Sequence, residues 1–181
     1  NDLEIHFTKA CENNCPFCID NLNAGIDESA KPNVNAIFTT ILVYSNKFDE
    51  ISIAGGEPCL YLDELHELCT LIKKYFPTKK LTLITSIPEI CFTKKDTFYK
   101  VLELCDYVTI SPQHHNQEIA DKIRGRKSGF DREEFYKNLP HKEKISITIN
   151  LIKNYLDTLD DVKTCLLYYN KLGFNKIKLC D

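Results

Sequence analysis

Three cysteines lie within one eight-residue segment, and their spacing carries the clearest chemistry in the chain. The segment has the pattern Cys11-x-x-x-Cys15-x-x-Cys18. Iron–sulfur clusters of the cubane type usually take four cysteine thiolates. Three local thiolates would leave one iron without a protein ligand, and a small molecule could bind there. The spacing therefore predicts a 4Fe–4S cluster with an open iron.

Zinc and disulfides are the ordinary alternatives for clustered cysteines. Zinc motifs usually pair two Cys-x-x-Cys knuckles, or one knuckle with two spaced histidines. The five histidines do not have that spacing: His6, His66, His114, His115 and His141. Nine cysteines is an odd number, and 181 residues can fold without disulfides. Free thiols favour a reducing compartment, so we expect a cytoplasmic protein.

Composition excludes several classes of function. An apolar content of 43% and a charged content of 27% are typical of a soluble globular domain. The net charge of −3 gives no basic surface for general nucleic-acid binding. No apolar run approaches the length of about 18 residues that a membrane span needs. Met is absent and the chain ends within a strand-like stretch, so we expect residues 1–181 to be one core domain, truncated after its sixth strand.

Strand-like and helix-like segments alternate along the chain. Six strands are expected: Leu3–Phe7, Ile51–Ala54, Leu81–Ile84, Tyr107–Ile110, Ile145–Leu151 and Lys176–Leu179. Helices between parallel strands form right-handed crossovers, which predicts an α/β fold. Six units are too few for a closed eight-fold barrel, so we expect a partial (β/α)6 barrel with helices outside. Chemistry is then expected at the carboxyl ends of the strands.

Local signals mark the ends of the expected helices. Asn33 is a candidate helix cap, and Thr93-x-x-Asp96 and Thr158-x-x-Asp161 resemble capping boxes. Residues 116–124 and 131–138 read as two short helices, and Gly173 can close the last helix. One face of that last helix is expected to point inward: Leu159, Val162, Cys165, Leu166 and Tyr169.

A second motif, Gly55-Gly56-Glu57-Pro58, follows the expected second strand. With the cysteine motif, where Phe17 precedes the last cysteine, it makes the chain resemble the radical SAM superfamily. The six β/α units agree with that family's partial barrel. The stretches Thr8–Cys11 and Ile147–Asp161 look most like the branch with molybdopterin-precursor synthase and peptide-modifying enzymes.

The resemblance implies an oxidoreductase-type radical enzyme. Cys11, Cys15 and Cys18 would hold the 4Fe–4S cluster, and S-adenosylmethionine would chelate the open iron. One-electron reduction would cleave it to methionine and a 5′-deoxyadenosyl radical, which abstracts hydrogen from a substrate. The expected cofactor-binding residues are Phe17, Gly55, Gly56, Glu57, Pro58, Thr85, Ser86, Ser111, Gln113 and Asn150. Glu57 would either hold the glycine turn or add charge near the cofactor's ammonium.

The substrate stays open at this level: a peptide, a nucleotide or a small metabolite. The resemblance implies a one-electron donor such as flavodoxin or ferredoxin. One alternative is an activating enzyme that makes a glycyl radical on a partner protein. The other is a non-catalytic iron–sulfur or zinc module, whose fourth ligand could be Cys59.

Several residues admit two interpretations. Cys59 and Cys180 are expected near the active rim, as buried thiols or as ligands of a second cluster. His6 is expected to be a core histidine. His114 and His115 could contact substrate or fill a loop. The basic cluster Lys122, Arg124, Arg126 and Lys127 could bind an anionic substrate group, although a solvated helix end is the commoner explanation.

Overall fold

One open sheet of parallel strands organises the chain in the computed structural model, which describes residues 1–18 and 31–180. Six strands lie side by side in sequence order: β1 (Asp2–Thr8), β2 (Glu50–Gly55), β3 (Lys80–Thr85), β4 (Tyr107–Ile110), β5 (Ile145–Asn150) and β6 (Lys176–Cys180). Each strand pairs in parallel with the next, and β1 and β6 remain edges. The predicted partial barrel is confirmed.

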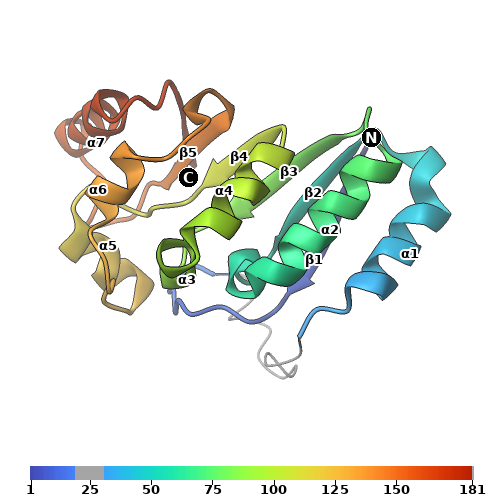
Figure 1. Ribbon diagram of the computed structural model, residues 1–181. Coiled ribbons are helices and arrows are strands. Elements are labelled where there is room, and N and C mark those ends of the chain that lie inside the picture. The colour runs from blue at the N-terminus through green and yellow to red at the C-terminus, as the bar shows by residue number, and fades with distance from the viewer. Residues whose placement is uncertain (19–30, 181) are drawn as a thin grey trace.

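The helices lie on one side of this sheet (Figure 1). They are α1 (Val34–Tyr44), α2 (Leu62–Tyr75), α3 (Glu89–Thr93), α4 (Lys95–Leu104), α5 (Gln117–Arg124), α6 (Arg132–Lys137) and α7 (Leu159–Lys171). Short 3-10 helices are η2 (Ser45–Lys47), η3 (Pro58–Tyr61) and η4 (Lys142–Lys144). Among the described residues, no helix is both long and apolar enough to cross a membrane.

Strand residues alternate between the helix layer and the open, concave face of the sheet. In β2, for example, Ile51 and Ile53 are fully buried against the helices. The residues that alternate with them, Ser52 and Ala54, are small or polar and are only partly buried. Only the face of the sheet that packs against the helices buries apolar side chains. The concave face can therefore carry polar groups.

Helix caps largely follow the sequence signals. Asn33, Asn116, Asp131 and Thr158 each accept a hydrogen bond from a backbone N–H in the first turn of the helix that follows. Gly173 follows α7 with a φ of +91°, as expected of a left-handed cap.

Two helix predictions were wrong. Thr93 ends α3 and donates its hydroxyl to Ile90 O, so it caps no helix, and Lys94 precedes α4 instead. Leu159 was expected to point inward but is 70% exposed. Leu159 is the first residue of α7, and the buried residues of this helix, Cys165 and Tyr169, lie further along it.

Candidate cluster and cofactor site

A cavity of 220 Å³ lies where the strands end, on the concave side of the sheet. Its wall comes from the last residues of the strands and from the loops that follow β1 to β4: Cys11, Asn13, Cys15, Phe17, Cys18, Gly55, Gly56, Glu57, Ile84, Thr85, Ser86, Ser111, Gln113 and Asn150. The structure thus brings together every residue expected at the site except Pro58. Pro58 is buried at the start of η3, outside the described wall of the cavity.

The three motif cysteines are partly or fully withdrawn from solvent. Cys15 is buried, and Cys11 and Cys18 are half-buried. Burial raises the pKa of Cys11 to about 12. A hydrogen bond from the backbone N–H of Asn13 to Cys11 Sγ lowers this pKa, but by less than burial raises it. A thiolate at this position therefore needs a positive partner such as iron.

The cysteine spacing suits a cluster better than a single ion. Within residues 1–18 and 31–180, no group of three or more Cys, His, Asp or Glu side chains is placed to hold one metal ion. In a cubane cluster each thiolate binds a different iron, so the sulfurs need not converge on one point. Three thiols facing one cavity fit such a cluster.

The Gly55-Gly56 turn is tied directly to the segment that leads into the cysteines. The N–H of Gly56 donates to Thr8 O over 2.7 Å, and the N–H of Glu57 donates to Ala10 O over 2.8 Å. These bonds fix the turn at the end of β2 beside the start of the cluster loop, residues 11–18. The two motifs therefore form one unit in space.

Glu57 is a buried structural carboxylate and holds the turn, the first of its two expected roles. It is 1% exposed. Its Oε1 accepts from the Thr85 hydroxyl at 2.7 Å and the Cys59 N–H at 3.0 Å. Its Oε2 accepts from the Ser86 N–H at 2.7 Å and the Ser86 hydroxyl at 2.6 Å. Glu57 thus joins the ends of β2 and β3.

Thr85 and Ser86 were expected to bind the cofactor, but their hydroxyl groups form hydrogen bonds within the protein. The Thr85 and Ser86 hydroxyl protons are used on Glu57, and Ser86 Oγ also accepts from Asn13 Nδ2 at 2.9 Å. The side chains of Gln113 and Asn150 are linked to each other at 3.2 Å, from Asn150 Nδ2 to Gln113 Oε1.

The structure divides the basic cluster into two arginines that pair within the fold and two lysines that are exposed. Arg124 is 1% exposed, and Arg126 forms ion pairs with Glu12 and Glu89. The backbone N–H of Asn14 donates to Arg124 O over 2.8 Å. Only Lys122 and Lys127 of the cluster are exposed. The end of α5 and the residues that follow it therefore hold the cluster loop through one backbone hydrogen bond and one ion pair.

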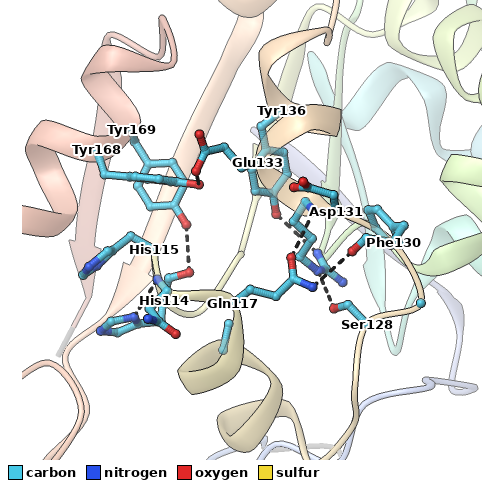
Figure 2. A pocket seen from close by; sticks show the side chains of 14 residues that line it. His114, His115, Gln117, Ser128, Phe130, Asp131, Glu133, Tyr136, Tyr168 and Tyr169 are labelled. Carbon is cyan, nitrogen blue, oxygen red and sulfur yellow. Dashed lines mark hydrogen bonds between the residues drawn. The ribbon is translucent and has the colours of Figure 1, made fainter.

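A second cavity, of 710 Å³, lies between α5, α6 and α7 (Figure 2). His114 and His115 belong to its wall and not to that of the cofactor cavity. Arg132 separates the two: it lines the larger cavity, and its Nη1 donates to Ser86 O over 3.0 Å. In another part of the wall of this larger cavity, the Tyr168 hydroxyl donates a hydrogen bond of 3.2 Å to Glu133 Oε2.

One further placement corrects the sequence analysis. His6 is exposed on the concave face and hydrogen-bonds Glu4 at 3.0 Å, so it is not a core histidine. Cys59 is fully buried in the core beneath the glycine turn, in agreement with the first of its two interpretations, a buried thiol. Cys180 is half-buried on the edge strand β6, opposite Asn150.

Sequence reasoning missed several residues of the site. Asn13 and Ile84 line the cavity, and Glu12 and Glu89 hold Arg126. Strand alternation could have placed Ile84 on the concave face, since Leu83 and Thr85 are buried. The Glu12–Arg126 pair spans 114 positions and leaves no local signal.

The family profile of the radical SAM superfamily matches residues 5–163 of the chain. Since this is most of its length, the chain belongs to the radical SAM superfamily. No curated protein matches the sequence significantly.

Solved structures share the fold at low sequence identity. SuiB of Streptococcus suis, bound to S-adenosylmethionine, has a TM-score of 0.71 and 17% identity over 98% of this chain and 38% of its own. Methylornithine synthase (PylB) has a TM-score of 0.69 and 14% identity over 99% of this chain and 52% of its own. TsrM of Kitasatospora setae, a radical S-adenosylmethionine methyltransferase with cobalamin and a 4Fe–4S cluster bound, has a TM-score of 0.66 and 13% identity over 97% and 36%.

This chain therefore spans between 36% and 52% of the length of these three neighbours.

Proposed function

We propose that this chain is the catalytic core of a radical SAM enzyme, with a 4Fe–4S cluster on Cys11, Cys15 and Cys18. The observation that carries the proposal is the shared cavity wall, which combines three thiols with the Gly55-Gly56 turn. The bound cofactors would supply one chemistry: one-electron cleavage of S-adenosylmethionine to a 5′-deoxyadenosyl radical, which takes hydrogen from an organic substrate.

The residues of the wall divide into binding and supporting roles. The glycines at 55 and 56 let backbone carbonyls approach the cofactor without a Cβ between them. Ser111, Gln113 and Asn150 have polar groups suited to the ribose or the carboxylate of the cofactor. Glu57, Thr85 and Ser86 hold the wall through their mutual bonds.

Phe17 is 42% exposed and lines the cavity, where its backbone would meet the adenine. Pro58 would act indirectly, by starting η3. A one-electron donor such as flavodoxin or ferredoxin would reduce the cluster. The alternative of a fully ligated, non-catalytic cluster needs a fourth thiolate. Cys59 does not support it, because it is 0% exposed and outside the described cavity wall.

The test is anaerobic reconstitution with iron and sulfide, followed by dithionite and S-adenosylmethionine. We expect 5′-deoxyadenosine in the wild-type reaction and only background in Cys15→Ala, because one cluster ligand is lost. Cys165→Ala is the matched control, since this thiol lies on the buried face of α7 and outside the described cavity wall. A protein that binds zinc but no cluster, or a Cys15→Ala variant as active as Cys165→Ala, would contradict the proposal.

A further inference from the structure

Arg132, the first residue of α6, is a buried cation that reaches the loop after β3. Only 6% of it is exposed. Its Nη1 donates to Ser86 O over 3.0 Å and to the Tyr136 hydroxyl over 3.3 Å. Its Nε donates to Ser128 Oγ over 2.9 Å, and its guanidinium lies over the Phe130 ring, 5.0 Å from the centroid. These contacts hold the guanidinium in one orientation, with one arm on the backbone of Ser86.

The backbone that Arg132 holds is strained. Ile87, directly after Ser86, is fully buried and has a φ of +56°, which a β-branched residue rarely adopts. Pro88 follows, and a residue before proline is driven toward extended backbone with negative φ. Such a conformation persists only where the surrounding contacts hold it. Here the Ile87 N–H donates to Thr85 Oγ1 over 2.9 Å, and Arg132 holds the carbonyl of Ser86.

Ser86 connects this strained turn to the cofactor cavity. Its N–H and its hydroxyl both donate to Glu57 Oε2, and its Oγ accepts from Asn13 Nδ2. All three residues line the 220 Å³ cavity, and they come from the loops after three different strands. Arg132 is outside the described wall of that cavity. It can therefore influence the wall only through Ser86.

We propose that Arg132 is a positioning residue for the S-adenosylmethionine site, because it holds the strained turn of Ser86 and Ile87 in the form that completes the cavity wall. This inference rests on the proposed function. Without the guanidinium, the turn can relax toward negative φ, and Ser86 then moves relative to Glu57 and Asn13. The cofactor would bind only the fraction of molecules in which the wall is correctly formed, so its apparent affinity falls by that fraction.

The experiment measures the dissociation constant (Kd) of S-adenosylmethionine from the protein reconstituted with iron and sulfide. In Arg132→Ala we expect the Kd to rise about tenfold, which corresponds to a correct wall in about a tenth of the molecules. In Arg132→Lys it should rise about threefold, because one ammonium keeps the charge but cannot replace both arms of the guanidinium. The KM for S-adenosylmethionine should rise with the Kd, while kcat for 5′-deoxyadenosine formation stays within about twofold of wild type.

Lys73→Met is the matched control, because it removes a partly buried cation that also ties a loop to the sheet. Lys73 Nζ donates to Lys79 O over 3.3 Å and pairs with Asp106, which accepts the N–H of Leu81 at the amino end of β3. This is the opposite end of β3 from Ser86. The Kd should therefore stay within about twofold of wild type.

Added guanidinium separates loss of the hydrogen bond from loss of packing. Arg132 also lines the 710 Å³ cavity, through which a small cation can reach the space that Arg132→Ala opens. Guanidinium chloride at about 50 mM, far below denaturing concentrations, should bring the Kd of Arg132→Ala back to within about threefold of wild type. Sodium chloride at the same concentration should not restore it.

Three results would overturn the role of Arg132: an unchanged Kd in both of its variants, an equal rise in Lys73→Met, or a rise that guanidinium does not lower. If Arg132→Ala does not fold, Arg132→Lys decides, since its Kd either rises or stays at the wild-type value. A wild-type protein that takes up no cluster, or that binds no S-adenosylmethionine, would instead contradict the proposed function.

Discussion

Gly56→Ala is expected to prevent stable cluster incorporation while the sheet still forms. An added Cβ at this position would lie 2.4 Å from Ala10 O and 2.7 Å from Lys9 O. Both atoms belong to backbone, so no flexible side chain can yield. The segment leading into Cys11 must move instead, and it carries the hydrogen bonds from Gly56 and Glu57.

The size of the effect follows from the cost of this displacement. Overpacking of a tight site costs about 1–3 kcal/mol. At the upper end, this weakens cluster binding about 100-fold, since 1.4 kcal/mol corresponds to about tenfold. We expect the iron and sulfide content per chain after reconstitution to fall to a few per cent of wild type, and the visible absorption of the cluster to be lost.

Gly173→Ala separates cluster loss from general backbone strain. Gly173 has a positive φ of +91°, so its backbone is strained by any side chain, but a Cβ there would meet only the flexible Lys142 side chain, at 3.4 Å. This variant should lower the free energy of unfolding by about 1 kcal/mol and load iron normally. Normal iron content in Gly56→Ala would mean that the cluster loop does not depend on its contact with the glycine turn.

The rim of the sheet could be predicted from sequence because parallel strands bring their carboxyl ends to one edge. The cysteine motif after β1 and the glycine turn after β2 lie on adjacent strands, and Asn150 ends the fifth. Strand order follows sequence order, so counting strands was enough to bring these residues to one cavity. No contact between side chains had to be known.

The misplaced residues depend on interactions that a single segment does not encode. Alternation with buried Phe7 places His6 on the opposite face of β1. The sequence alone does not say that no helix covers that face, so the exposure of His6 could not be predicted. The sequence left Cys59 open between a buried thiol and a cluster ligand, and only the turn of η3 shows that it lies in the core. The buried state of Arg124 needs Asp121, Ser128 and the cluster loop together, so its helix-end position alone was misleading.

Glu57→Ala is expected to be the most destabilising single change at the site. Removing the carboxylate leaves four donors without their acceptor: the N–H groups of Cys59 and Ser86 and the hydroxyls of Thr85 and Ser86. Truncating one side of a buried charged network costs about 3–5 kcal/mol, against a total stability of about 5–15 kcal/mol. Urea unfolding should therefore shift to markedly lower concentrations. Glu67→Ala, at an exposed carboxylate on α2, should stay within about 0.5 kcal/mol of wild type.

The pH dependence of stability gives a second, independent readout of Glu57. Burial raises the pKa of this carboxyl above its usual value of 4.5, and the hydrogen bonds from Ser86, Thr85 and Cys59 only partly oppose the rise. Because the pKa is higher in the folded than in the unfolded protein, the neutral acid favours folding. The contribution is complete below pH 4.5 and is lost as the pH rises through the folded-state pKa.

Glu57→Gln removes this titration and keeps the volume of the side chain. Its amide nitrogen cannot accept the two bonds from Ser86, so we expect a loss of about 2–3 kcal/mol at the pH where the wild type is most stable. The loss should shrink as the pH rises, because only the wild-type protein then carries the cost of a buried charge. Urea unfolding of both proteins at several pH values measures this difference directly. A constant gap would show that Glu57 has the same pKa in the folded and unfolded chains, and that its four donors fully compensate its burial.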